Sequence, residues 1–275
     1  IQGFTVKGGT ITGGTGMSFG GSPVDLRAIT GGTVDHVVMS SSSQSASMIE
    51  CTFAGNITLT NNTITANMEI LADRQQLFSA IQLIHSTGVI VVTDNTISGK
   101  CALGITILGN NIGPNHDPGF TSISILRNTI NQQAFWTESY GMFLSGVNNF
   151  EVANNTVQPV RGRGFYLDGN PNNSGGYTYT GTIHDNIFQA IEGPNLEYYQ
   201  NGMEATAART RGGSMLGISW TNNTFAAYTG VGLDWCAIGF RCSYDTAGGI
   251  NNNGNMLFQG NIFKAIVTAP DPALT

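Results

Sequence analysis

Four side chains in the second half of the sequence have the residue types of a catalytic site for sugar chemistry. They are Tyr166, Asp168, Glu204 and Asp234, and each lies in a short segment that begins with glycine. If these segments are neighbouring strands, the outward side chains share one face, because alternate residues of a strand point to opposite sides. Carboxylates held side by side repel, which raises the pKa of one of them and separates an acid from a base.

We therefore expect Glu204, with Asp234 or Asp168, to be the working carboxylates, and Tyr166 to be their hydrogen-bonding or stacking partner. On neighbouring strands, the diagonal between Asp168 and Glu204 separates their Cα atoms by roughly 8 Å. That distance lies in the ~6.5–9.5 Å range of inverting glycosidases, whereas Glu204 and Asp234 would lie nearer the retaining geometry. The alternative is that these are solvated carboxylates of an ordinary surface.

Basic and aromatic residues gather in the same part of the sequence. The substrate-binding candidates are Arg161, Arg163, Arg209, Arg211, Tyr177 and Tyr198. Guanidinium groups bind the carboxylate or sulfate of an acidic sugar through paired hydrogen bonds. In an elimination reaction one arginine would neutralise the uronate, and Tyr166 or His184 would remove the neighbouring proton. The alternative for the arginines is that they anchor loops through salt bridges.

A repeat that runs through the chain must position these residues. Residues 149–169 form one copy: an alternating strand, the pair Asn154 and Asn155, the β-branched Val157, a corner, and a second strand opened by Gly164. The step from asparagine to an apolar residue two places on recurs along the chain at spacings of 27 to 38 residues. Such self-similarity is the signature of a repeat architecture.

Constant strands with variable corners predict a single right-handed parallel β-helix over residues 1–275, an all-β solenoid of roughly eight coils with its long corner loops in the second half. Its core should contain one column formed by Ile81, Ile105, Met142, Phe165, Met203 and Leu233. The outward column beside it should contain Gln82, Thr106, Phe143, Tyr166, Glu204 and Asp234. Each repeating asparagine should cap a tight corner and bond to the asparagines of the neighbouring coils.

This repeat, over about residues 1–265, resembles the parallel β-helix of the pectate-lyase-like superfamily. The superfamily includes polygalacturonases, alginate lyases and epimerases, and many phage tailspikes. The resemblance implies the fold more strongly than a reaction, because such folds host several chemistries. The catalytic strings of the better-known branches are absent from the sequence, and Asn115-His116-Asp117-Pro118 differs in order from the Asp-Pro-His-Asp of mannuronan epimerases. No functional residue is therefore carried over.

The amino-acid composition limits the classes of binding partner that we expect. A net charge of −6 and a pI near 5.0 give no reason to expect nucleic acid or an anionic membrane. No apolar run approaches the roughly 20 residues that span a bilayer. We expect no cofactor and no metal, because neither the histidines nor the cysteine spacing fits a zinc site. Four cysteines allow three pairings, and the favoured disulfide joins Cys236 to Cys242 across a short loop.

These observations together predict an extracellular protein, secreted or attached to a surface, that binds a polysaccharide and degrades it as a glycosidase or lyase. The rival prediction is a non-catalytic structural or adhesive β-helix, such as a fibre, surface or spike segment. The sequence starts and stops inside strand-like segments, so we expect a piece of a longer or processed chain. Open solenoid ends would favour homo-oligomers or filaments.

Overall fold

The computed structural model describes residues 2–13, 24–27, 30–41, 47–67, 79–109, 120–132, 139–168, 180–191, 205–211, 217–230, 237–243 and 256–268. Every regular element in these ranges is a β-strand, and every recorded strand pairing is parallel. Within the same ranges no helix has the length and apolar character needed to cross a membrane.

The strands form three stacks, which we call sheets A, B and C. Sheet A contains β1 (Gln2–Lys7), β4 (Thr30–Asp35), β7 (Gly55–Thr60), β10 (Thr87–Thr93), β13 (Phe120–Leu126), β16 (Phe150–Ala153), β18 (Gly181–His184), β21 (Ile218–Thr221) and β24 (Leu257–Gln259). Sheet B contains β2 (Thr10–Gly13), β5 (Val38–Ser41), β8 (Thr63–Asn67), β11 (Thr96–Lys100), β14 (Thr129–Gln132), the first part of β17 (Thr156–Asp168), β19 (Ile187–Ile191), β22 (Thr224–Gly230) and β25 (Ile262–Thr268).

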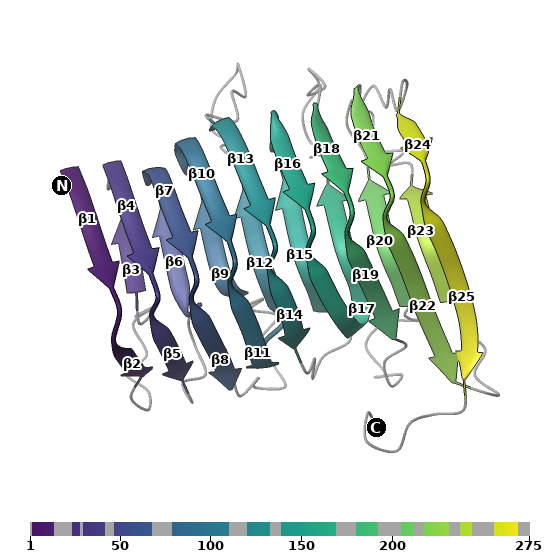
Figure 1. The fold of residues 1–275 in the computed structure, drawn as a ribbon, viewed down its shortest axis with the longest axis horizontal. Coiled ribbons are helices and arrows are strands. Elements are labelled where there is room, and N and C mark those ends of the chain that lie inside the picture. The colour runs from purple at the N-terminus through teal and green to yellow at the C-terminus, as the bar shows by residue number, and fades with distance from the viewer. Residues whose placement is uncertain are drawn as a thin grey trace.

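Sheet C contains β3 (Val24–Arg27), β6 (Ile49–Thr52), β9 (Ser79–Ile84), β12 (Leu103–Leu108), β15 (Ser139–Ser145), the second part of β17, β20 (Ala205–Arg211) and β23 (Ala237–Ser243). Strands that follow one another in the chain belong to different sheets, and hydrogen-bonded neighbours lie one coil apart. This is a parallel β-helix, as predicted. Sheet A has nine strands in the described residues, and Figure 1 shows them stacked side by side from β1 at the left to β24 at the right.

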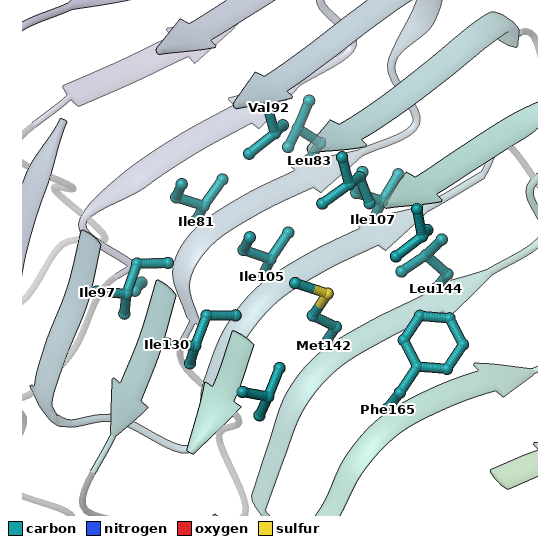
Figure 2. Packing of buried hydrophobic residues seen from close by; sticks show 14 of the residues in the cluster. Ile81, Leu83, Val92, Ile97, Ile105, Ile107, Ile130, Met142, Leu144 and Phe165 are labelled. Carbon is teal, nitrogen blue, oxygen red and sulfur yellow. The ribbon is translucent and has the colours of Figure 1, made fainter. Parts of the chain in front are cut away.

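The core is built from columns of identical or similar side chains on successive coils. Ile81, Ile105, Met142 and Phe165 are in register across sheet C and fully buried, which confirms the first four members of the predicted column. Figure 2 shows them beside a second column of Leu83, Ile107 and Leu144. Beyond Phe165 the prediction was wrong, because the next two positions are Ala208 and Phe240 rather than Met203 and Leu233.

Large aromatic rings fill the core of the later coils. Phe165 packs against Phe188 with ring centroids 4.9 Å apart, and meets Trp220 edge to face at 5.7 Å. Trp220 is fully buried, and the ring of Phe225 lies with its centroid 6.0 Å from that of Trp220. Each such ring buries a large apolar area, so these coils carry a dense part of the hydrophobic stabilisation.

An unbroken ladder of asparagines, buried up to Asn223, joins the coils at the corner between sheets A and B. Its members are Asn62, Asn95, Asn128, Asn155, Asn186, Asn223 and Asn261. At each step the backbone N–H and the side-chain amide of one asparagine donate to Oδ1 of the next. From Asn95 to Asn128 both distances are 3.0 Å, and the amide also donates to the carbonyl of Leu59 at 2.9 Å. The predicted corner role of these asparagines is confirmed.

The chain turns this corner through a left-handed residue placed just before each ladder asparagine. Asn61, Asp94, Asn154, Asp185 and Asn222 all have φ between 54° and 58°, a conformation that Asn and Asp tolerate better than other side chains do. Arg127 occupies the same position with φ of 53° and forms two 2.7 Å hydrogen bonds to Asp94 on the preceding coil. The hydrogen bond from Arg127 lowers the pKa of Asp94 below its ordinary value.

Candidate functional site

The outward column of sheet C passes through Glu50, Gln82, Thr106, Phe143, Tyr166, Arg209 and Arg241. The sequence correctly placed Gln82, Thr106, Phe143 and Tyr166 in it. The prediction was wrong for the last two coils, because Arg209 occupies the position beside Tyr166 that was predicted for Glu204, and Arg241 occupies the next position, which was predicted for Asp234.

Three aromatic side chains on the outer side of sheet C form a cluster of their own. The rings of Phe143 and Tyr166 stack 5.1 Å apart with an interplanar angle of 13°. The ring of Tyr140 lies 5.5 Å from that of Phe143 and 5.4 Å from that of Tyr166. Ala102 and Leu103 complete the cluster from β12 and the residue before it. A second apolar cluster therefore covers the outside of the sheet, separate from the core.

Two arginines lie on this cluster. The guanidinium carbon of Arg163 is 4.9 Å from the ring centroid of Tyr166 and 5.1 Å from that of Tyr140. The Nη1 of Arg163 also donates a 2.6 Å hydrogen bond to the hydroxyl of Tyr140. The guanidinium carbon of Arg209 is 5.5 Å from the ring centroid of Tyr166. Cation–π attraction holds both charges over aromatic rings, and is stronger where water is excluded.

Tyr166 faces outward as predicted, but only 4% of its surface is exposed. Neighbouring rings and two guanidiniums cover it, so it presents almost no ring to a sugar. The structure therefore does not support the predicted role of Tyr166 as a stacking partner for a sugar. The tyrosine instead supports the arginines, whose own side chains are half-buried.

Asp168 lies two residues beyond Tyr166, in the next outward column between Ser145 and Arg211. Its carboxylate thus has a basic residue, not a second carboxylate, as its neighbour in register. Among the described residues of β17, β20 and β23 it is the only acidic side chain, whereas the same strands carry five arginines. In the described residues this face of the later coils is basic, while Glu204 and Asp234, on which the predicted acidic groove depends, lie outside them.

Several predicted residues lie outside the described part of the chain, namely Glu204, Asp234, Tyr177, Tyr198 and Cys236. Arg161 and Arg211 are placed by their backbones alone: Arg161 is in register with Ile191 in sheet B, and Arg211 with Asp168 in sheet C. Cys242 belongs to β23, and its disulfide with Cys236 stays a prediction. Cys51 and Cys101 are buried in the interior, and burial raises the pKa of the Cys101 thiol to about 12.

His184 is not part of this face, because it belongs to β18 in sheet A. Its Nε2 lies 3.1 Å from Oε1 of Glu151, and its Nδ1 lies 2.8 Å from Oδ2 of Asp185. Partial burial lowers the pKa of His184, but the hydrogen bonds that the ring donates to Asp185 and Glu151 outweigh it, and the net pKa is raised above 6.5. The histidine is thus stabilised in its charged form, which does not suit the proton abstraction suggested for it from the sequence.

Sequence reasoning missed Tyr140 as a member of this surface, and it did not place Arg241 in the outward column of Tyr166. A signal for that register was present, because Gly239-Phe240-Arg241 has the same order of small, aromatic and outward residues as Gly164-Phe165-Tyr166. In the described residues, no group of three or more His, Cys, Asp or Glu side chains is arranged to hold a metal ion.

Comparison with known families agrees with this geometry. A family model described as right handed beta helix region matches residues 47–225, and the chain belongs to that family. The match establishes the right-handed β-helix, and it is consistent with the pectate-lyase-like superfamily without specifying it. No curated protein and no solved structure matches the chain.

Proposed function

We propose that this protein binds an acidic polysaccharide along the outer face of sheet C, from β15 to β23. The anion-contacting residues are Arg163, Arg209 and Arg241, with Arg161 and Arg211 at the margins. The observation that carries the proposal is the pair of guanidiniums from Arg163 and Arg209 laid over the single ring of Tyr166.

The distribution of charge supports this choice of ligand. The chain has eleven basic residues and a net charge of −6, yet five of the eleven lie in β17, β20 and β23. A local cluster of positive charge on a protein with a negative net charge attracts negatively charged ligands. Arginine suits carboxylate and sulfate groups because its planar fork donates two parallel hydrogen bonds.

The repeat of the fold supports a polymer rather than a small anion. Arg209 and Arg241 occupy successive positions of one column, and neighbouring strands lie about 4.8 Å apart. Two cations held one strand spacing apart match neighbouring anions along a polymer. The rings beneath the arginines restrict their rotamers, so less conformational entropy is lost when a ligand binds.

We also propose that the protein cleaves the bound polysaccharide. Asp168 is the carboxylate of this face in the part of β17, β20 and β23 that the structure describes, and Glu204 and Asp234 come shortly before β20 and β23 in the sequence. We propose these three as the groups that would act on the bound chain, in an extracellular or surface-attached protein. Product release from a panel of acidic polysaccharides, compared with the Glu204→Gln and Asp234→Asn variants, tests this part. Binding without product release would instead identify the adhesive β-helix.

The binding step is tested by changing the charge of the polysaccharide. Affinity electrophoresis in gels that contain polygalacturonate is compared with gels that contain its methyl ester, which keeps the sugar chain and removes the charge. The proposal predicts retardation by the acid and not by the ester. Other uronate and sulfated chains extend the panel. Equal migration in acidic and neutral gels across that panel would refute the proposal.

A further inference from the structure

Phe53, at the corner between sheets C and A, is an exposed aromatic residue in a backbone conformation that suits glycine. It lies between β6 and β7 and has a φ of 53°. Its backbone N–H donates to the carbonyl of Ile84 at 3.0 Å, yet the residue is 57% exposed. A bulky residue with this φ is an outlier, because its Cβ crowds the neighbouring backbone.

The same corner position is held by glycine on later coils. His85, Gly109 and Gly146 follow Phe53 along this column, since the N–H of each donates to the carbonyl that ends the sheet C strand of the next coil. Gly146 has a φ of 64°, which glycine adopts without strain. A glycine in place of Phe53 would remove both the backbone strain and the exposed ring, so the fold alone does not account for the phenylalanine.

The ring of Phe53 is held by the ring of His85. Their centroids lie 5.2 Å apart and their planes differ by 25°. His85 also has a positive φ, of 51°, and within the described residues its buried Nδ1 has no hydrogen-bond partner. Two strained residues and an unpaired buried nitrogen cost stability. Costs of this kind are typical of functional sites, where the geometry itself is used.

Phe53 borders the same sheet that carries the proposed binding face. The successive strands β6, β9, β12, β15, β17 and β20 place the coil of Phe53 five strand spacings from that of Arg209, which is about 24 Å. The strands from β6 to β15 carry no arginine or lysine, and β6 carries Glu50. A polymer that extends from Arg209 along the sheet would meet no cation on these strands, so an uncharged contact is the kind that could hold it there.

We propose that Phe53 is a stacking subsite for a pyranose ring of the polysaccharide that Arg209 and Arg241 bind, an inference that rests on the proposed function. The C–H groups on one face of a pyranose ring are apolar and pack against an aromatic ring, and this contact needs no charge on the sugar. His85 fixes the orientation of the phenyl ring, which lowers the conformational entropy lost on binding. The binding site then has an anion-binding part at the arginines and an uncharged part at Phe53.

The test compares a long and a short ligand by isothermal titration, at equal folded fraction of each variant. Polygalacturonate can span both parts, whereas digalacturonate offers two carboxylates to the arginines and is too short to reach Phe53. If another acidic chain retards the protein more, that chain and its disaccharide take their place. Phe53→Gly should weaken the binding of the polymer by about fivefold or more and leave that of the disaccharide within about twofold.

Two further measurements separate a ligand contact from a structural role. Phe53→Tyr keeps the aromatic ring and should leave the affinity for both ligands within about twofold. Urea denaturation of Phe53→Gly should show little or no loss of stability, because glycine relieves the strain at this φ.

The outcomes distinguish failure of the subsite from failure of the proposed function. Unchanged affinity of Phe53→Gly for the polymer, while Arg209→Gln weakens it, would overturn the subsite and leave the anion-binding face in place. An equal loss for the polymer and the disaccharide would also overturn it, because Phe53 would then support the arginines or the fold rather than a sugar ring. If neither variant weakens binding of the polymer, the proposed function fails and the subsite fails with it.

Discussion

The guanidinium of Arg209 lies over the ring of Tyr166, 5.5 Å from its centroid, and the two residues are direct partners in the pairing of β17 with β20. Arg163 covers the same ring at 4.9 Å from within β17. One buried tyrosine thus sets the position of two cations from neighbouring coils. Binding of a ligand by these two arginines therefore depends on the Tyr166 ring, because that ring positions their guanidinium groups.

The role of the ring predicts a difference between two substitutions of Tyr166. Tyr166→Phe keeps the aromatic face, so the affinity for an acidic polysaccharide should stay within about twofold of that of the unchanged protein. Tyr166→Ala removes the support of both arginines, and the affinity should fall by about tenfold, equivalent to ~1.4 kcal/mol. Isothermal titration at equal folded fraction measures this difference. Equal losses in the two variants would mean that the ring does not position the arginines.

The asparagine ladder predicts a large loss of stability from one small change. Asn128→Ala removes the acceptor of two hydrogen bonds from Asn95 and the donor of others to Asn155 and to the carbonyl of Val92. All these groups are buried, so the free energy of unfolding should fall by about 3 kcal/mol or more. Urea denaturation measures it. Asn154→Gly is the control, because glycine adopts the φ of 57° there without strain, and it should change stability by less than about 1 kcal/mol.

Close backbone packing at the start of the sheet C strands predicts a position-dependent effect of a single methyl group. A Cβ on Gly141 would lie 2.3 Å from Cγ1 of Val157 and 2.5 Å from the carbonyl oxygen of Gly164. Gly141→Ala should therefore destabilise the protein by about 1–3 kcal/mol. Gly239→Ala, where the nearest atom is 3.4 Å away, should have little effect. Thermal unfolding measures the stabilities of the two variants, and equal stabilities would contradict close packing around Gly141.

His184 predicts a pH-dependent contribution to stability. Its folded pKa is raised, so the protonated histidine stabilises the fold fully below the unfolded value of 6.5, and this stabilisation is lost as the pH rises through the folded pKa. Its partners Glu151 and Asp185 are each nearly half exposed, so solvent screening limits the effect to about 0.5–1 kcal/mol. His184→Gln should thus destabilise the protein more at about pH 5.5 than at about pH 8.5. Equal destabilisation in urea at both pH values would contradict it.

Much of the fold could be predicted because its signals are local and repeated. The asparagine before each apolar residue marks one corner in every coil, and the alternation around it fixes which side chains enter the core. From Ile81 to Phe165, the second marker, a small residue just before the inward side chain of each sheet C strand (Ala80, then Gly104, Gly141 and Gly164), also led to the correct register.

The same marker misled the prediction in the later coils. The position of Gly164 is taken by Ala207 in the next strand, so Gly202 was chosen in its place and the strand was read too early. In the following coil Gly232 was chosen, although Gly239 is the glycine at the marker position. Corners between sheets B and C vary in length without changing the coils, so spacing along the sequence could not reveal the error. The cation–π contacts of Arg209 depend on that register and could not be predicted either.

The most direct test of the account is the affinity of the Arg209→Gln variant for polygalacturonate, or for whichever acidic chain retards the unchanged protein most, measured by isothermal titration. Arg127→Gln, which removes an arginine from the corner between sheets A and B, is the matched control. We predict that Arg209→Gln weakens binding by about tenfold or more, ~1.4 kcal/mol, while Arg127→Gln leaves it within about twofold. Equal affinities of the two variants would contradict a binding face on sheet C.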